Sequence, residues 1–217
     1  MARRIRRSLW GSSFQRTLGA LSRSTLRSGT RAVARASTRA LKAAAKKASP
    51  ASPRKAPAGA GNWLTGAAGA RRYRLFKPPG ARQSSPLPLL VMLHGCDQDA
   101  AGFARSTRLQ APAARHGFML LFPAQDRVAN AQGCWNWFDT RSGRAFTEAA
   151  SLIAAIDQAC ALHGADPARV AIAGMSAGAS MAAFTALHYP DRFKAVAMHS
   201  GVAPGTAHST ATALGAM

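Results

Sequence analysis

Two short runs of large apolar residues constrain the fold of this chain more than any other feature. Residues 89–93 and 118–122 are apolar at every position, without the alternation of polar and apolar side chains that marks a half-exposed strand. Strands of this continuous type are buried on both faces, as in a parallel sheet that helices cover on both sides. The two runs therefore favour an α/β architecture.

Strand-like and helix-like segments alternate along the second part of the chain. We expect strands at 73–76, 89–93, 118–122, 170–173 and 193–198, and helices at 100–115, 146–163 and 177–188. The helix over 146–163 places apolar residues three and four positions apart, with Gly164 beyond its end. This order predicts an α/β domain with a mostly parallel sheet and helices on both faces.

The charge is concentrated in the N-terminal part of the chain. The formal net charge is +21, and no acidic residue precedes Asp97. Residues 1–96 hold 20 of the 29 Lys and Arg residues, so 9 basic and 8 acidic residues follow. The excess of positive charge therefore belongs to a tail, and the nearly neutral remainder is not predicted to be a nucleic-acid-binding domain.

Residues 1–61 form this tail, which is rich in Ala, Arg, Ser and Pro and ends in a proline-rich linker at 49–57; we expect the folded domain over 62–217. Five arginines recur every four residues, namely Arg23, Arg27, Arg31, Arg35 and Arg39. The tail is predicted to be either a disordered extension or a basic amphipathic helix that contacts an anionic surface, a polymer granule or nucleic acid. Its composition also resembles a transit peptide, and its arginines interrupt the apolar segment that a secretory signal needs.

The uncharged segment 170–190 is long enough to cross a bilayer. Four small residues interrupt it, and it is mostly Ala rather than Leu; these residues are Gly174, Ser176, Gly178 and Ser180. A strand, a sharp turn and a helix of small residues explain this pattern better than a membrane span. We therefore expect no transmembrane segment.

The turn in that segment, Gly174-Met175-Ser176-Ala177-Gly178, has the G-x-S-x-G spacing between a predicted strand and a predicted helix. In this context a tight turn exposes a nucleophilic serine at the carboxyl end of the sheet. The glycines are needed because the strand and the helix pass closely. We expect Ser176 to be a nucleophile; the alternative is a packing turn made of small residues.

A nucleophilic serine also needs two backbone N–H groups that stabilise the negative charge on the substrate oxygen. One is expected from Ala177, the residue directly after the nucleophile. The second is expected from the loop His94–Gln98 after the strand at 89–93, with the N–H of Cys96 as the donor. His94 lies on the oxyanion side, so we interpret it as structural.

Four segments of the chain resemble poly(3-hydroxybutyrate) depolymerase-type esterases in order and spacing: Leu93–Gln98, Gly133–Phe138, the Ser176 turn and His199–Gly201. The resemblance covers about residues 63–217 and implies an α/β-hydrolase fold. It also implies hydrolysis of esters, typically hydroxyalkanoate polyesters or their oligomers, with relatives acting on feruloyl or acetyl esters. By position, Ser176 matches the nucleophile, and Cys96 and Ala177 match the oxyanion donors. The resemblance implies an extracellular protein, whereas the interrupted export segment favours a cytoplasmic or granule-associated one.

The chain departs from this family after the serine, where α/β-hydrolases place the triad acid and then the histidine. Asp191 is the sole acidic residue there, and the histidines are His188, His199 and His208; none matches a family triad position. We therefore expect an N-terminal part of an esterase, with the C-terminal strands, the triad acid and the base missing and little or no turnover alone. The alternative is a non-catalytic surface- or polymer-binding protein built on a degenerate hydrolase scaffold.

Three cysteines are too few for a disulfide scaffold. Cys96 and Cys134 both follow predicted strands on the active-site side. They form either a disulfide that ties the oxyanion loop to the tryptophan loop or two separate buried thiols. Cys160 lies on the inner face of its predicted helix, which indicates a core position.

The tryptophan loop carries Trp135 and Trp137. These side chains either line an acyl or polymer groove or anchor the loop in the core. His199 ends the last predicted strand near the same rim and is a third candidate for substrate lining. The sequence has no metal-ligand spacing and no phosphate-binding loop, so we expect neither a metal nor a cofactor.

Overall fold

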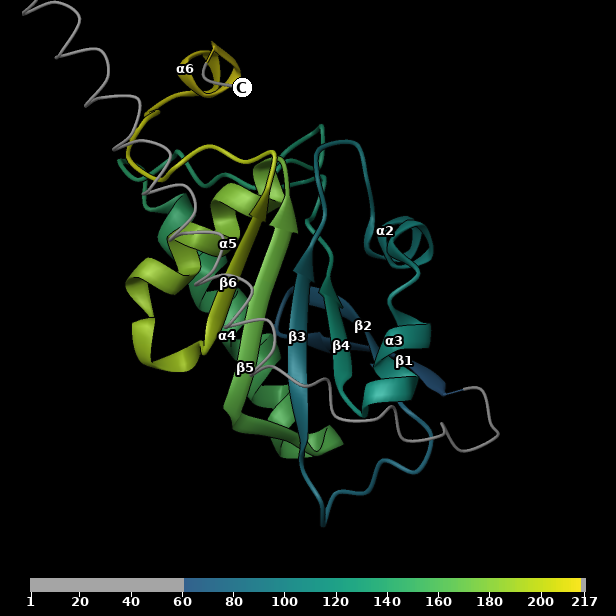
Figure 1. Cartoon of the computed structure of the whole chain (residues 1–217). Coiled ribbons are helices and arrows are strands. Elements are labelled where there is room, and N and C mark those ends of the chain that lie inside the picture. Colours follow the sequence, from purple (N-terminus) through teal and green to yellow (C-terminus); the bar gives the residue numbers. More distant parts are fainter. Residues whose placement is uncertain (1–60, 216–217) are drawn as a thin grey trace, which may run out of the picture. The chain divides into compact units, whose positions relative to one another are not determined.

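The computed structural model describes residues 61–215. The basic tail and its linker, predicted over residues 1–61, therefore lie outside the described residues except for Gly61. Six strands form one sheet in the order β1-β2-β4-β3-β5-β6 (Figure 1). Their bounds are β1 Asn62–Ala68, β2 Arg71–Lys77, β3 Leu87–Leu93, β4 Met119–Pro123, β5 Ala165–Met175 and β6 Ala195–His199.

The sheet is mostly parallel, as the continuous apolar runs predicted. Strand β3 pairs in parallel with β4 and β5, and β6 pairs in parallel with β5. Strand β2 runs antiparallel to β4, and β1 runs antiparallel to β2, so a hairpin extends one edge of the parallel part. The sequence pattern predicted only residues 73–76 of this hairpin. Strand β1 was not predicted, because its residues are partly exposed and lack a continuous apolar run.

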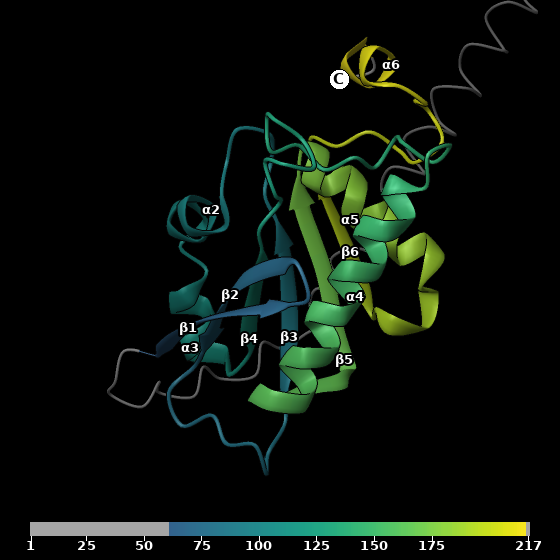
Figure 2. The ribbon, with the colours of Figure 1, turned by 180° about the vertical axis from the view of Figure 1, so that it is seen from behind.

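Helices cover both faces of the sheet, as predicted. Helices α4 and α5 pack on one face of the sheet, and α2 and α3 pack against β4 on the other face (Figures 1 and 2). The helices and the short 3-10 turn are α2 Ala100–Thr107, α3 Gln110–His116, α4 Arg144–His163, α5 Ala177–His188, η1 Pro190–Arg192 and α6 Thr210–Gly215.

Alternate side chains of β3 enter two separate cores because successive residues of a strand point to opposite faces. Leu89, Val91 and Leu93 pack with the buried residues of α4 and α5. Met92 belongs to the second core, with Phe103 of α2. This two-sided burial explains why the strand has no polar position.

The prediction of a single helix over 100–115 is wrong, because the structure contains two helices there. The left-handed conformation of Arg108, with φ 52°, ends α2, and α3 begins at Gln110. Pro112 explains the break: it has no N–H to donate to the carbonyl of Arg108 four residues earlier, and its ring would clash with that carbonyl. In the first turn of a new helix a proline causes no such conflict.

Helix α4 is long and apolar enough, by length and composition alone, to cross a membrane. In the structure it lies against the sheet, and Ala149, Leu152 and Ile156 are fully buried in the core that it shares with β3 and β5. A core helix of this kind passes the same length and composition test. The uncharged segment 170–190 forms the end of β5, the turn at Ser176 and α5.

Candidate active site

Ser176 occupies the turn between β5 and α5 with an unusual backbone conformation. Its φ is 54° and its ψ is −125°, a combination that costs a residue with a side chain about 1–3 kcal/mol. The N–H of Ser176 donates to the carbonyl of His199 at 2.8 Å, and its carbonyl accepts from the N–H of Ala179 at 2.9 Å. The side chain is half-exposed at the carboxyl end of the sheet.

The two glycines of the motif are required by close backbone contacts. A Cβ on Gly174 would lie 2.3 Å from the carbonyl carbon and oxygen of Gly178. A Cβ on Gly178 would lie 2.4 Å from the carbonyl oxygens of Leu93 and His94. Strand β5, helix α5 and the end of β3 approach one another so closely that only glycine fits at these two positions.

Ala177 is the first residue of α5 and is almost fully buried behind Ser176. The N–H groups in the first turn of a helix have no acceptor within the helix, and the helix N-terminus favours negative charge. The position expected for an oxyanion donor therefore lies directly after the serine and at a helix start.

Residues 94–98 form a tight loop after β3. The N–H of Gly95 donates to Oε1 of Gln98 at 2.8 Å, and the N–H of Gln98 donates to the carbonyl of Gly95 at 3.4 Å. The N–H of Asp97, a residue with φ 57°, donates to the carbonyl of Gln132 at 2.8 Å. The loop is therefore closed on itself and tied to the segment around residue 132.

The oxyanion loop and the serine turn are direct neighbours. The backbone of His94 meets Gly178, as described above, and a Cβ on Gly95 would lie 3.3 Å from Cε of Met175. The structure thus brings Cys96 and Ala177, predicted as the two amide donors, to the same edge of the sheet as Ser176.

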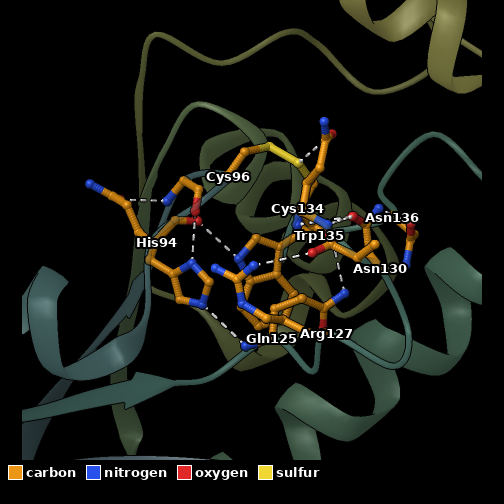
Figure 3. The surroundings of a disulfide bond; sticks show 12 residues. His94, Cys96, Gln125, Arg127, Asn130, Cys134, Trp135 and Asn136 are labelled. Carbon is orange, nitrogen blue, oxygen red and sulfur yellow. Dashed lines mark hydrogen bonds between the residues drawn. A yellow bond between two sulfur atoms is a disulfide. The ribbon is translucent and has the colours of Figure 1, made fainter.

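Cys96 and Cys134 form a disulfide that connects the oxyanion loop to the tryptophan loop (Figure 3). Of the two alternatives in the sequence analysis, the structure therefore contains the bonded one. Cys160 is a free, half-buried cysteine on α4.

The prediction that Trp135 and Trp137 line a substrate groove is wrong, because their exposed fractions are 0% and 2%. The Nε1–H of Trp135 donates to the carbonyl of His94 at 3.0 Å, and its ring packs 5.5 Å from the His94 imidazole (Figure 3). Trp137 is part of the core shared with α4 and α5. Both side chains anchor the loop, as in the other alternative, since an indole buries a large apolar area.

A buried polar network lies beneath the tryptophan loop, and the sequence analysis missed it. Its members are Arg71 on β2, Gln125 after β4, Asn136 in the loop and Glu148 on α4. Burial lowers the pKa of Arg71, and the nearby Glu148 carboxylate opposes that shift. One signal was available: Glu148 is a lone carboxylate on the face of α4 that also carries the buried Ala145 and Leu152.

The histidines after Ser176 lie in different places. His188 is at the far end of α5, about 18 Å along the helix axis from Ser176, and its ring packs at a tilt against Phe184. Asp191 follows in the exposed turn η1. His199 ends β6, and its Nδ1 lies 3.2 Å from Oγ of Ser200. His208 is exposed in the C-terminal segment.

His199 also lines a pocket of about 450 Å³ on the α2 side of the sheet. Its walls are mostly apolar and include Met92, Phe103, Met175 and Met198. Within residues 61–215, no group of three or more His, Cys, Asp or Glu side chains is arranged to hold a metal ion.

Comparison with known proteins agrees with this geometry. The sequence profile of the family described as Esterase PHB depolymerase matches residues 71–217, which is more than half of the chain. The chain is 36% identical over 129 residues to poly(3-hydroxyalkanoate) depolymerase C from Paucimonas lemoignei, covering 59% of this chain and 31% of that protein. It is 32% identical over 144 residues to feruloyl esterase B from Neurospora crassa, covering 65% of this chain and 47% of that protein.

These matches span less than half the length of either relative. Among solved structures, the acetyl xylan esterase from Aspergillus awamori superposes with a TM-score of 0.59 at 21% identity, covering 71% of this chain and 56% of that one. At this level of identity the superposition establishes the fold, which is that of an α/β-hydrolase. With the profile match over residues 71–217, the chain belongs to the PHB depolymerase family of esterases.

Proposed function

We propose that this chain is a carboxylic ester hydrolase, or the part of one that carries the nucleophile, and that Ser176 forms the acyl-enzyme. The observation that carries the proposal is the conformation of Ser176 together with its neighbours. A serine with positive φ stands between two glycines that admit no side chain, next to the loop that contains Cys96. Strain of this kind persists where the surrounding structure enforces it, and it is concentrated at functional sites.

The chemistry follows from this arrangement. Oγ of Ser176 forms a bond to the ester carbonyl carbon, and the carbonyl π electrons move to the oxygen, which becomes negatively charged. The N–H groups of Cys96 and Ala177 stabilise that charge, and losing one such donor costs about 100- to 1000-fold in rate. A general base takes the proton of the Ser176 hydroxyl and returns it to the alcohol oxygen as the C–O bond to the alcohol breaks. Water hydrolyses the acyl-enzyme in the same way. Asp191 and the histidines after Ser176 match no triad position of the family, so turnover by this chain alone is expected to be slow.

We further propose that the substrates are poly- or oligo-hydroxyalkanoates or related carboxylic esters. One relative is named as a poly(3-hydroxyalkanoate) depolymerase, and the other as a feruloyl esterase. The apolar pocket that contains Met175 and His199 is compatible with an aliphatic acyl group. Comparing hydrolysis of a 3-hydroxybutyrate oligomer with hydrolysis of methyl ferulate distinguishes these two classes.

The nucleophile is tested by labelling the full chain with a fluorophosphonate and locating the adduct by mass spectrometry. We expect one adduct, on Ser176, that is lost in Ser176→Ala. Ser180→Ala is the matched control, because Ser180 lies one turn later on α5 and is fully buried. An unlabelled wild-type chain, or an adduct that persists in Ser176→Ala, contradicts the proposal. The former result favours the non-catalytic scaffold instead.

A further inference from the structure

We propose that Glu148, Gln125 and His94 act together as a buried relay that fixes the orientation of the Gly95–Cys96 peptide. In this role they are positioning residues for the Cys96 oxyanion donor. The inference rests on the proposed function, because it assigns a task to that donor. It concerns side chains that come from α4, from the segment after β4 and from the end of β3.

The relay begins at the Glu148 carboxylate, which is 5% exposed and accepts three hydrogen bonds. Oε1 accepts from Nε2 of Gln125 at 2.6 Å and from Nδ2 of Asn136 at 2.6 Å. Oε2 accepts from the backbone N–H of Asn136 at 2.9 Å. Charge-assisted hydrogen bonds of this kind are about twice as strong as neutral ones, so the carboxylate is a firm anchor for both amides.

Hydrogen bonds to both polar atoms of its side chain fix Gln125, and they thereby fix the position of its backbone N–H. Its Oε1 accepts from Nη1 of Arg71 at 2.7 Å, and its Nε2 also donates to the carbonyl of Cys134 at 3.0 Å. The backbone N–H of Gln125 then donates to Nε2 of His94 at 3.1 Å (Figure 3). A backbone N–H can only donate, so Nε2 of a neutral His94 carries no proton and the ring proton resides on Nδ1.

That tautomer determines the next contact. Nδ1–H of His94 donates to the carbonyl of Gly95 at 2.8 Å, so this carbonyl faces the buried imidazole (Figure 3). The peptide from Gly95 to Cys96 is trans, since the described residues contain no cis peptide bond. In a trans peptide the N–H and the C=O point in opposite directions. The N–H of Cys96 is therefore directed away from the buried ring.

The relay thus explains why the donor is already oriented before substrate binds. If His94 no longer donated to the carbonyl of Gly95, the longer hydrogen bond from the N–H of Gln98, at 3.4 Å, would be left to hold that carbonyl. This peptide could then rotate, and the carbonyl oxygen could replace the N–H at the oxyanion position. The result would be repulsion of the developing negative charge instead of its stabilisation. Such an error lowers the rate of the chemical step, whereas substrate binding in the ground state depends on it much less.

A pair of His94 variants tests the relay in the full chain. His94→Phe keeps an aromatic ring but has no donor, and His94→Asn keeps an N–H near the position of Nδ1. We expect the maximal rate constant for fluorophosphonate labelling of Ser176 (kinact) to fall about 100-fold in His94→Phe, because the phosphonyl oxygen needs the same donor, with the half-saturating probe concentration (KI) changed less than twofold. His94→Asn should recover at least tenfold of that loss. Glu148→Gln, at the start of the relay, should lie between wild type and His94→Phe.

A second measurement requires no turnover. The ring ¹⁵N and ¹H signals of His94 in the wild-type chain should identify the Nδ1–H tautomer, with Nε2 as an acceptor. The Nε2–H tautomer, or fast exchange between the two, overturns the relay even if the esterase is active. Equal labelling rate constants (kinact) in His94→Phe and wild type overturn it as well. Absent labelling of Ser176 beside the expected tautomer instead contradicts the proposed function and leaves the ring contact supported.

Discussion

The two halves of the candidate site are built in different ways. The serine turn is made by five consecutive residues, and its shape follows from Gly174 and Gly178, where backbone atoms leave no room for a Cβ. The oxyanion loop is held by groups from distant segments: Arg71, Gln125, Cys134 and Glu148 all contribute to it or to its support. A local motif can therefore encode one half of a site, while the other half exists only in the folded chain.

The largest change in the free energy of unfolding is expected from a substitution in the serine turn. Gly178→Ala places a Cβ 2.4 Å from the carbonyl oxygens of Leu93 and His94, and backbone atoms cannot move aside as a flexible side chain does. We expect the free energy of unfolding to fall by about 3 kcal/mol or more. Denaturant unfolding of the purified variants measures it.

Gly102→Ala is the control for that variant, because the nearest atom to its added Cβ is Oδ1 of Asp99 at 3.5 Å. Inside α2, alanine is favoured over glycine by about 1 kcal/mol, so this variant should be neutral or slightly more stable. Similar unfolding midpoints for the two variants would show that the serine turn tolerates side chains and is not determined by its glycines.

The next largest change in stability is expected from opening the disulfide that holds the oxyanion loop. Replacing Cys96 and Cys134 together by alanine opens a link between residues 38 positions apart. We expect a loss of about 2–4 kcal/mol in unfolding free energy relative to wild type under oxidising conditions, where the wild-type disulfide is intact. Cys160→Ala, which removes a free and half-buried thiol, should cost about 1 kcal/mol or less. A double variant as stable as wild type would mean that hydrogen bonds alone hold the loop.

A smaller effect is expected from Gln98→Met. This change removes the acceptor of the buried Gly95 N–H, and an unsatisfied buried donor costs about 1 kcal/mol or somewhat more. Gln132→Met is matched to it, because Gln132 supports the loop through its backbone carbonyl, which the substitution retains. If both variants unfold at the same denaturant concentration, the side chain of Gln98 does not contribute to closing the loop.

Acid is expected to destabilise the folded chain partly through His94, which supports the oxyanion loop. Burial lowers the pKa of the His94 imidazole below 6.5, and the Arg71 charge lowers it further, whereas the Gly95 carbonyl and Asp99 raise it. The unfolded chain therefore binds more protons than the folded chain just below pH 6.5. The free energy of unfolding of the protein should therefore decline as pH falls from 6.5 to the pKa of His94 in the folded state.

Comparison with His94→Asn isolates this imidazole from the other histidines, including His163, whose pKa is also lowered by burial. The decline should be shallower in the variant, as measured by unfolding at fixed pH values between 7 and the acid limit of folding. Parallel curves for the two chains would show that the folded protein does not exclude a proton from His94.

Much of the fold was predictable because its signals are local. The runs 89–93 and 118–122 predicted buried strands of the parallel part: the first lies within β3, and the second is shifted by one residue from β4. The periodic pattern over 146–163 predicted α4 to within two residues. The break between α2 and α3 was missed, although Pro112 marks it, because the apolar pattern continues past the proline. Strand β1 gave a weak pattern because its residues are partly exposed, and for the same reason it contributes little to the core.

The roles of aromatic and charged residues were harder to predict. Trp135 and Trp137 were equally consistent with a groove and with a core, since an indole suits both, and only their neighbours determine which one is realised. Gln125 and Glu148 carry no motif at all. Their importance arises from contacts across 23 positions of sequence, which no local pattern encodes.

The sequence by itself determined the alternation of strands and helices and the turn at Ser176, because strand burial and glycine sterics act between residues that are close along the chain. Only the tertiary structure decided that Cys96 bonds Cys134, that the tryptophans are buried and that the N–H of Gln125 donates to Nε2 of His94. The physical reason is that buried polar groups must find partners, and those partners are supplied by segments that meet only after the sheet and its helices have packed.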